Sequence, residues 1–375
     1  MIDKKYDMVI FGATGFTGKL ICNYISKHKD AKNLNWSIAG RNKEKLEEIS
    51  REYSVDYLLA DSFDDSSLNT MSQKAKLIIT TVGPYSIYGE NLVASCIKND
   101  AHCLDLTGEP DFVKKIYTNY NKLAKDSNSI IIHSCGFESI PSDLGAYITV
   151  KKINADDIDL TYYLKTKGKI SGGTWASFLN SISSGIGSSA EKLQSSKSQK
   201  IKKFFYSKEF KRWALIFPVI DKYIVIKSSK NIEGYGENLN FNLYTMQRSL
   251  FSIILLISGI LTLSFLSKIK FIRKFLLSRI PSGTGPSKEE RKKHWFQVTI
   301  IGKTESKEVH TTISGGDPGY DETAKFISEM GLCILTQTND LLQKNGILTP
   351  VECTGDLMID RLKNAGIIIN RKIIK

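Results

Sequence analysis

The sequence predicts an α/β protein with an N-terminal doubly wound parallel sheet and a second domain of the α+β type. Short apolar runs alternate with amphipathic stretches over about the first 150 residues, and a glycine-rich turn follows the first apolar run. This alternation stops after Gly145. A length of 375 residues also suits two or three domains.

The N-terminal elements follow from the length and period of each stretch. The expected strands are Asp7–Phe11, Trp36–Ala39, Tyr57–Ala60, Leu77–Thr81, Cys103–Leu106 and Ile130–His133. The expected helices are Thr17–Ser26, Lys43–Glu52, Asn91–Lys98 and Asp111–Asp126. Strands and helices that alternate in this way build parallel βαβ units, so residues 1–150 are expected to form one domain.

Residues 151–345 are expected to form a substrate or dimerisation domain, which makes a homodimer one option for this chain. Its strands alternate less often with helices, and this favours an antiparallel α+β arrangement. The expected elements are strands Ile158–Leu164, Trp295–Ile301 and Val309–Ile313 and helices Trp175–Ser189 and Tyr320–Thr336. Residues 195–290 are interpreted as an insertion, and residues 346–375, with a helix at Asp356–Asn364, as a segment that packs back on the first domain.

The positive charge is concentrated in one segment. The formal net charge is +13, and the stretch from Lys192 to Lys293 alone holds 21 Lys/Arg against 6 Asp/Glu. It includes the uncharged apolar run Ser249–Ser267, which basic residues follow. Basic charge beside apolar surface favours peripheral attachment of residues 249–279 to an anionic membrane. Two alternatives stay open: a buried core or dimer-interface helix, and a true crossing, since the run would extend about 28 Å as a helix.

Several classes of partner are disfavoured by the composition. The six cysteines and five histidines form no metal-ligand or paired spacing, so neither a metal site nor a disulfide framework is expected. No motif or aromatic platform for reading nucleic acid accompanies the basic residues. The N-terminus leads directly into a strand without a signal-peptide pattern, so the expected location is cytoplasmic, with peripheral membrane association.

A phosphate-binding loop follows the first strand. The strand Met8–Phe11 runs into Gly12-Ala13-Thr14-Gly15-Phe16-Thr17-Gly18, and a helix begins there. Glycines permit the tight turn and the close approach of the backbone to a pyrophosphate, which the amides of the helix N-terminus then bind. This context predicts a Rossmann-type dinucleotide site with Gly12, Thr14, Gly15, Phe16, Thr17 and Gly18 as cofactor-binding residues.

The loop after the second strand indicates which dinucleotide binds. An NAD-binding domain usually has an acidic residue there, whereas this sequence has Arg41. A guanidinium can hold a 2′-phosphate bidentately, so the expected cofactor is NADP, as NADPH in the reducing direction. Asp61, after the third strand, can reach the adenine edge, although a carboxylate in an exposed turn is an equally good interpretation.

Loops after the later strands supply candidates for chemistry, because the carboxyl ends of parallel strands line the ligand crevice. Val82, Gly83 and Pro84 are expected beside the cofactor. Tyr85, Tyr88 and Glu109 are the candidate catalytic residues, with a tyrosine hydroxyl donating a proton or polarising a carbonyl. The loop from Ser134 to Asp143 adds further carboxylates and hydroxyls, and helix capping is the alternative interpretation for both loops.

Several collinear motifs resemble one known family. GATGFTG, AGR, TVGPYSIYGE, CLDLTGEPDF, CGFESIPSDLG, SGGT, GPSKEER, GDPGYDETA and GILTP resemble the saccharopine dehydrogenase-like oxidoreductases, in particular their trans-acting enoyl reductase branch. The resemblance implies an NAD(P)-binding domain, a second α+β domain, reduction of enoyl intermediates of lipids in some bacterial members, and an association of animal relatives with membranes and lipid droplets. Glu138 stands where the family usually has Asp.

These observations together predict an NADP-dependent oxidoreductase that reduces a lipid-type enoyl or carbonyl substrate at a membrane surface. Saccharopine metabolism is disfavoured, because a substrate with several carboxylates calls for arginines and none occurs between Thr81 and Asp143. The alternative is a catalytically weak NADP-binding scaffold associated with a membrane or lipid droplet.

Overall fold

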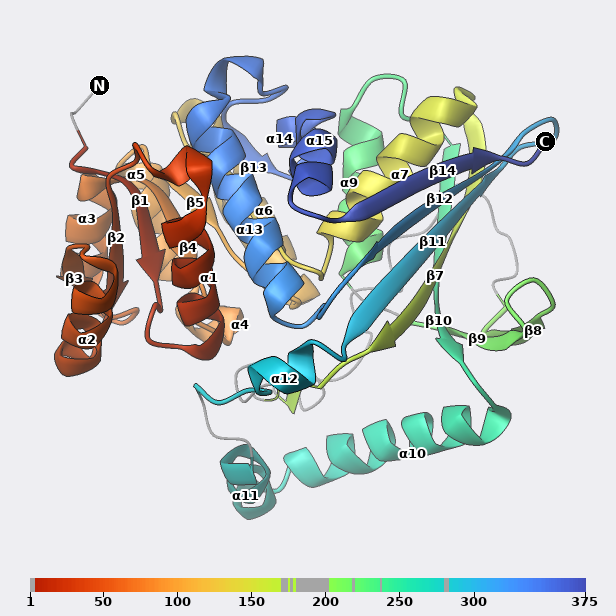
Figure 1. Ribbon diagram of the computed structural model, residues 1–375, viewed down its shortest axis with the longest axis horizontal. Helices are drawn as coiled ribbons and strands as arrows, with labels where there is room; N and C mark the ends of the chain where they lie inside the picture. The colour runs from red at the N-terminus through yellow and green to blue at the C-terminus, as the bar shows by residue number, and fades with distance from the viewer. Residues whose placement is uncertain are drawn as a thin grey trace.

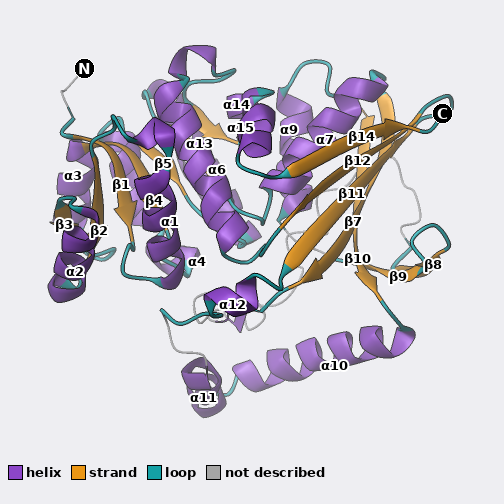
Figure 2. Cartoon of the chain, in the orientation of Figure 1, coloured by secondary structure: helices purple, strands orange, loops and turns teal. Residues whose placement is uncertain are grey.

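Two seven-stranded sheets form the frame of the molecule in the computed structural model (Figure 1). The structure describes residues 4–169, 175, 178–179, 202–217, 220–236, 238–279 and 283–375. Helices cover both faces of the first sheet, and a group of helices lies between it and the second sheet (Figure 2). The predicted α/β class with a second α+β part is confirmed.

The first sheet is parallel throughout. In spatial order its strands are β3 (Tyr57–Leu59), β2 (Trp36–Gly40), β1 (Tyr6–Phe11), β4 (Ala75–Thr80), β5 (His102–Leu104), β6 (Ile130–Ile132) and β13 (Gly346–Leu348). The order reverses between β1 and β4, and such a switch point opens the crevice in which doubly wound sheets bind dinucleotides. Six of the seven strands are those that the sequence predicts.

Buried strands and amphipathic helices explain this half of the fold. Every residue of β2 is buried, as expected for a strand covered on both faces. The side chain of Asn42 caps the following helix by accepting a hydrogen bond from the Lys45 amide at 2.8 Å. The helices are α1 (Phe16–Lys27), α2 (Lys43–Tyr53), α3 (Asp65–Lys74), α4 (Tyr85–Tyr88), α5 (Glu90–Lys98), α6 (Pro110–Asp126) and α7 (Ile140–Ile153), with a 3-10 turn at Lys29–Ala31.

The second sheet is mostly antiparallel, with one parallel pair, β7 and β10. Buried residues alternate along β7, the pattern of a strand with one face on the core. The spatial order is β14 (Ile368–Ile373), β12 (Glu308–Gly315), β11 (Trp295–Lys303), β7 (Asp157–Lys167), β10 (Asn238–Gln247), β9 (Arg212–Ile216) and β8 (Phe204–Ser207). The three strands predicted for this domain are present, whereas the predicted helix Trp175–Ser189 lies outside the described residues except for 175, 178 and 179.

The interpretation of residues 195–290 as an insertion is corrected by the structure. Strands β8, β9 and β10 are integral to the second sheet, and helix α9 (Asp221–Asn231) packs against α7. Leu239, Phe241 and Leu243 alternate along β10 with their side chains buried. Lysines and serines around these elements obscured the period of two in the sequence. The part that projects from the sheet comprises helices α10 (Leu250–Ser267) and α11 (Lys270–Arg279).

The C-terminal third joins the two halves. Helix α13 (Asp321–Thr336) packs on α1 and β4 of the first half, where Gly331 allows the close approach: a Cβ atom there would lie 3.1 Å from Ile79 Cδ1. Strand β13 then pairs with β6. The chain continues through α14 (Pro350–Thr354) and α15 (Leu357–Asn364), and β14 pairs with β12. The last segment therefore touches both sheets, beyond the expected packing on the first domain alone, because the two halves share one continuous core.

Helices α10 and α11 stand apart from both sheets at the lower edge of Figure 1. Only Ile253 and Ser267 of α10 are buried, and no residue of α11 is. Large apolar side chains point to solvent, including Phe251, Leu255, Leu261, Phe265 and Phe271. Among the described residues α10 is long and apolar enough to cross a membrane. The alternative of a helix buried in the core of this chain is wrong.

Candidate functional site

Steric packing requires glycine at two positions of the phosphate loop. Gly12 has φ of +90°, and a Cβ atom there would lie 2.7 Å from Thr81 Oγ1. At Gly18 a Cβ atom would lie 2.3 Å from the carbonyl oxygen of Gly12, so any side chain would push α1 off the loop. Gly15 differs, because a Cβ atom there would have the Gly12 oxygen at 3.2 Å as its one near contact. The open side of the loop therefore lies at Gly15.

The start of α1 suits an anion. Gly15 is its N-cap and supplies no side-chain cap, and the first turn carries no acidic residue. The amides of this turn are thus available to a phosphate group, and the helix dipole favours negative charge there. Thr14, Phe16 and Thr17 flank the position and are half-buried. The residues present fit the pyrophosphate of a dinucleotide.

The two adenosine-side candidates lie at the carboxyl ends of β2 and β3. Arg41 is exposed and makes no hydrogen bond or ion pair with the described part of the chain. Its guanidinium is therefore free for a ligand. Asp61 is half-buried, and its Oδ1 accepts a hydrogen bond from the Phe63 amide at 3.0 Å. That bond closes a local turn, so contact of Asp61 with adenine remains a prediction.

The loop after β4 touches the phosphate loop directly. The Thr81 amide donates to the carbonyl oxygen of Phe11 at 2.9 Å, and the Thr81 hydroxyl donates to that of Gly12 at 3.2 Å. Val82, Gly83 and Pro84 continue from there, with a cis peptide bond before Pro84. Their position beside β1 and β4 is the switch point of the sheet, where the sequence places the cofactor.

The three catalytic candidates have structural contacts. The carboxylate of Glu109 accepts hydrogen bonds from the amides of Tyr85 at 2.8 Å and Ser86 at 3.1 Å, so it caps helix α4. The Tyr85 hydroxyl donates to the carbonyl oxygen of Thr80, and burial raises the pKa of this hydroxyl well above its ordinary value. Tyr88 packs its ring edge-on against Phe63. Their catalytic roles remain predictions, because these contacts give each of the three residues a structural role.

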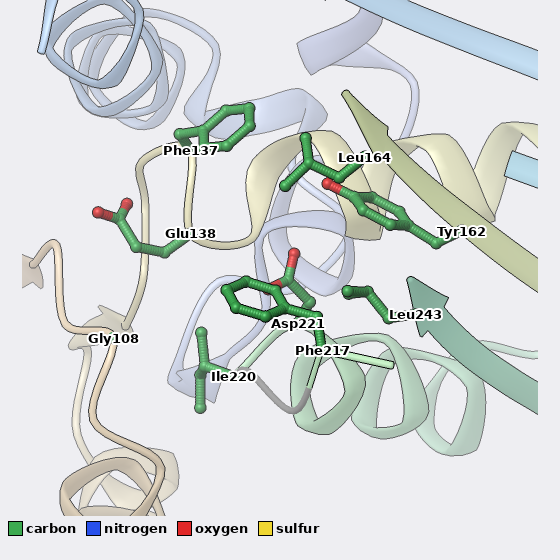
Figure 3. Close-up of a pocket in the computed structure, with 9 residues that line it drawn as sticks. All are labelled: Gly108, Phe137, Glu138, Tyr162, Leu164, Phe217, Ile220, Asp221 and Leu243. Atoms are coloured by element: carbon green, nitrogen blue, oxygen red, sulfur yellow. The ribbon is translucent and has the colours of Figure 1, made fainter. Parts of the chain in front are cut away.

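A cavity of about 190 Å³ opens between the two sheets on the cofactor side. Gly108 and Glu138 follow β5 and β6 of the first sheet, whereas most of the opposite wall comes from β7, β10 and the segment around the start of α9 (Figure 3). The wall is largely apolar and aromatic. Its residues are Gly108, Phe137, Glu138, Tyr162, Leu164, Phe217, Ile220, Asp221 and Leu243.

Two carboxyl groups interrupt the apolar wall. Burial raises the pKa of Glu138 to about 7, and the nearby charge of Asp105 adds to the shift. Burial likewise raises the pKa of Asp221 to about 7, against the lowering effect of a hydrogen bond from Ser142. Glu138 Oε2 is inaccessible to solvent and has no hydrogen-bond partner among the described residues. A cavity with both groups can hold a proton at neutral pH.

Sequence reasoning selected neither carboxyl group as catalytic. Glu138 lies in the loop from Ser134 to Asp143 that the sequence indicated, and the position of this loop after a buried strand was the available signal. Asp221, Phe217 and Leu243 fell within the presumed insertion. The alternation of apolar residues along β10 was the signal that could have predicted a strand with one face in the core.

Comparisons with known proteins agree with the predicted NADP cofactor. Residues 8–132 match the family described as the saccharopine dehydrogenase NADP binding domain, which covers β1 to β6 and the phosphate loop. The fold and the site thus define an NADP-binding oxidoreductase with a Rossmann domain. Within that class the chain is similar to the saccharopine dehydrogenase-like oxidoreductases, as its motifs suggested.

Relatives match over nearly the full length. The saccharopine dehydrogenase-like oxidoreductase of Rattus norvegicus is 28% identical, covering 97% of this chain and 96% of the relative. A Mycobacterium tuberculosis protein named as a trans-acting enoyl reductase is 29% identical, with 97% of each chain covered. A lipid droplet localized protein of Caenorhabditis elegans is 27% identical, again with 97% of each chain covered. The resemblance therefore extends through both sheets.

A solved structure supports the fold independently. The apo saccharopine dehydrogenase (L-Glu forming) of Saccharomyces cerevisiae superposes with a TM-score of 0.60, covering 99% of this chain and 100% of that chain. The two sequences are only 12% identical, so this similarity concerns the arrangement of the elements. It confirms that the two sheets and their connections form a known architecture.

Proposed function

We propose that this protein reduces a lipid-type enoyl or carbonyl substrate with NADPH at a membrane surface. The observation that carries the proposal is the apolar cavity on the cofactor side of the first sheet. Six of its nine lining residues are aliphatic or aromatic, and neither Lys nor Arg is among the nine. Such a wall favours an acyl chain, since apolar surface gains free energy when it leaves water.

The same wall argues against a substrate with several carboxylates. Its two ionisable groups, Glu138 and Asp221, are acids that would repel negative charge once ionised. An amino-acid dicarboxylate needs bidentate cations, as arginine provides. The chemistry of the cavity thus agrees with the absence of arginine between Thr81 and Asp143.

Exposed apolar surface supports the membrane part of the proposal. Phe251 and Phe271, on α10 and α11, are 73% and 82% exposed. Large exposed apolar patches mark interaction surfaces. Basic residues follow and line this surface: Lys268, Lys270, Arg273, Lys274 and Arg279. An anionic membrane interface satisfies both features, because the cations reach the headgroups while the apolar side chains enter the acyl region.

Peripheral attachment suits the topology better than a single crossing. Strand β10 precedes α10, strand β11 follows α11, and both pair with β7. A single crossing would put β10 and β11 on opposite sides of the bilayer and separate them from their common neighbour. Helices α10 and α11 therefore lie in the interface in this proposal, as a connection that leaves and rejoins the same sheet.

The chain's own residues position the reaction. NADPH supplies a hydride when it is bound, and the phosphate loop and Arg41 hold its charged groups. The loop after β4 forms the inner end of the cofactor crevice. Phe137, Tyr162 and Leu243 exclude water from the acyl chain and fix its approach. Proximity and orientation of this kind supply much of the rate of a two-substrate reaction.

A substrate panel tests the proposal. NADPH oxidation is followed by absorbance with enoyl and ketoacyl thioesters of increasing chain length, and with an amino-acid dicarboxylate as the control substrate. We expect turnover with the longer acyl thioesters and none with the dicarboxylate. Stoichiometric NADPH binding without oxidation across the panel would instead favour a catalytically weak NADP-binding scaffold on a membrane or lipid droplet.

A further inference from the structure

We infer that Glu138 is the acid that protonates the substrate after hydride transfer, with Asp221 as the second acid of the same cavity. This inference rests on the proposed function, since it assigns a residue to that reduction. Glu138 lines the cavity from the loop after β6, and Asp221 lines it from the start of helix α9 (Figure 3). Neither residue is part of the phosphate loop or of the helix caps described above.

The surroundings of Glu138 leave one oxygen of its carboxyl group without a hydrogen-bond partner. A Cβ atom at Gly136 would lie 2.2 Å from Glu138 Oε2, so the carboxyl group folds over the bare backbone of that glycine. Oε2 is inaccessible to solvent and finds no hydrogen-bond partner among the described residues. Buried polar groups in folded proteins are almost always satisfied, because an unpaired one costs free energy. The Glu138 backbone supplies a hydrogen bond to the carboxyl group, so Oε2 alone is unpaired, and a buried unpaired oxygen at a cavity wall points to a ligand that completes it.

Two other buried carboxyl groups, those of Asp143 and Glu109, differ in this respect. Both oxygens of Asp143 are satisfied: Oδ1 accepts from the Ser228 hydroxyl at 2.6 Å, and Oδ2 accepts from the Val351 amide at 3.0 Å. Both oxygens of Glu109 accept from backbone amides. Burial raises the pKa of Asp143 to about 7, as it does for Glu138, but Asp143 does not line the cavity. It therefore provides a matched control.

Burial and the acidic groups around them leave the two acids partly protonated at neutral pH. Glu138 interacts electrostatically with four titratable groups, which are Asp105, Tyr85, Cys135 and Asp221. Asp221 interacts electrostatically with Glu138, Asp143 and Tyr162. None of these groups is a cation, and burial raises the pKa of Glu138 and of Asp221 to about 7. Each acid can therefore both give and regain a proton near that pH.

The step balances with one hydride and one proton. Bound NADPH would supply a hydride that forms a C–H bond at the β-carbon of an enoyl thioester, with the electron pair of the double bond moving toward the α-carbon. The α-carbon takes the proton of Glu138, whose O–H bond breaks and leaves a carboxylate. For a carbonyl substrate the same proton goes to oxygen. Glu138 regains a proton from water or from Asp221, so the net reaction consumes NADPH and one solvent proton.

The test compares Glu138→Gln, Glu138→Asp and Asp143→Asn with the wild type in the full chain. Glu138→Gln keeps the size of the side chain and removes the acid, so we expect kcat to fall roughly a hundredfold or more with the NADPH Kd unchanged. We also expect the fall in kcat above neutral pH to disappear. Glu138→Asp should restore part of the rate, and Asp143→Asn should keep the wild-type pH profile. A Glu138→Gln enzyme within twofold of wild type, with the same pH profile, would overturn the inference.

A second measurement decides the inference even if no thioester is reduced. A long-chain methyl ketone is the probe, and infrared difference spectroscopy follows the band of protonated carboxyl groups. We expect the ketone to shift a band that Glu138→Gln lacks and Asp143→Asn retains. A bound ketone that leaves the band unchanged contradicts the role of Glu138. A shifted band without turnover of any thioester supports Glu138 as the hydrogen-bonding acid and contradicts the proposed substrate instead.

Discussion

The guanidinium of Arg291 lies over the ring of Phe16, 5.4 Å from its centroid. Phe16 belongs to the phosphate loop, whereas Arg291 lies at the end of the short helix α12 (Lys288–Arg291), just after α11. Tyr320 meets the same ring edge-on at 5.1 Å, and Asp321 accepts a hydrogen bond from Arg291 Nε at 2.8 Å. The segment 283–291 thus ties the α10–α11 connection to the cofactor loop.

A methyl group at Gly285 should weaken cofactor binding. A Cβ atom there would lie 2.6 Å from the Phe16 ring, so the ring must move and the phosphate loop with it. We expect Gly285→Ala to lower NADPH affinity about tenfold, or about 1.4 kcal/mol, measured by calorimetric titration. Gly168→Ala is the control, because its Cβ atom would meet Pro318 at an ordinary 3.8 Å. Equal affinities of both variants would show that the ring adapts freely.

Arg41 should account for the preference for NADPH over NADH. The side chain is exposed at the end of β2 and free among the described residues. Arg41→Asp exchanges a cation for an anion beside the 2′-phosphate, so the preference should fall by most of its value while NADH binding changes little. Titration of both cofactors against both proteins measures it. A wild type that binds NADH and NADPH equally well would contradict the assignment.

Two glycines of the phosphate loop should respond differently to substitution. Gly15→Val places its side chain in the open side of the loop, so the protein should stay folded and lose NADPH binding. Gly18→Ala meets the Gly12 carbonyl oxygen at 2.3 Å, so it should lower the free energy of unfolding by a few kcal/mol. Thermal unfolding and cofactor titration separate the two effects. Normal binding by Gly15→Val would remove the phosphate from this position.

The buried carboxyl group of Asp143 should make stability depend on pH. Burial raises its pKa from 3.8 to about 7, so the folded chain holds the proton more tightly than the unfolded chain does. The contribution of Asp143 to the free energy of unfolding therefore falls as pH rises from about 4 to about 7, and is constant above that.

Asp143→Asn removes this titration. As pH rises from about 4 to about 7, the free energy of unfolding of Asp143→Asn should rise relative to that of the wild type. The expected rise is up to about 1.4 kcal/mol per pH unit. Denaturant unfolding at several pH values measures both curves. Parallel curves would mean that the pKa of Asp143 is not raised in the folded protein.

The segment 249–279 should be dispensable for the fold and required for membrane binding. Its replacement by a short Gly/Ser linker removes α10 and α11, which bury almost no side chains. We expect this variant to bind NADPH and to lose flotation with anionic liposomes. The variant Phe251→Ser with Phe271→Ser, at two exposed positions, should bind liposomes more weakly without loss of stability. An intact protein that stays unbound at low salt would contradict membrane attachment, and a misfolded replacement variant would mean that the fold depends on this segment.

The N-terminal half was predictable because its signals are local. A strand buried on both faces requires a continuous apolar run, and a turn with positive φ requires glycine, as at Gly12. The strand, the turn and the helix that bind a pyrophosphate are consecutive in the chain. The six strands, the phosphate loop and the NADP cofactor could therefore be predicted from neighbouring residues alone.

The candidate acids depend on contacts between distant segments. Glu138 and Asp221 meet at one cavity because α9 packs on α7 and β10 pairs with β7. The Glu109 carboxylate, by contrast, is occupied by the amides of α4, which its position in the sequence does not reveal. Burial and hydrogen-bond partners decide whether a carboxyl group is a cap or an acid, and both are properties of the packed structure.

The sequence by itself determined the Rossmann half, its glycine loop, the position of Arg41 and the apolar, basic character of residues 249–279. Only the tertiary structure decided that β8, β9 and β10 belong to the second sheet, that α10 is exposed, and that Gly285 rests on Phe16. Periodicity along a chain records which side of an element is buried. It does not record what buries that side, because the partner is selected by pairing and packing between segments that are far apart in the sequence.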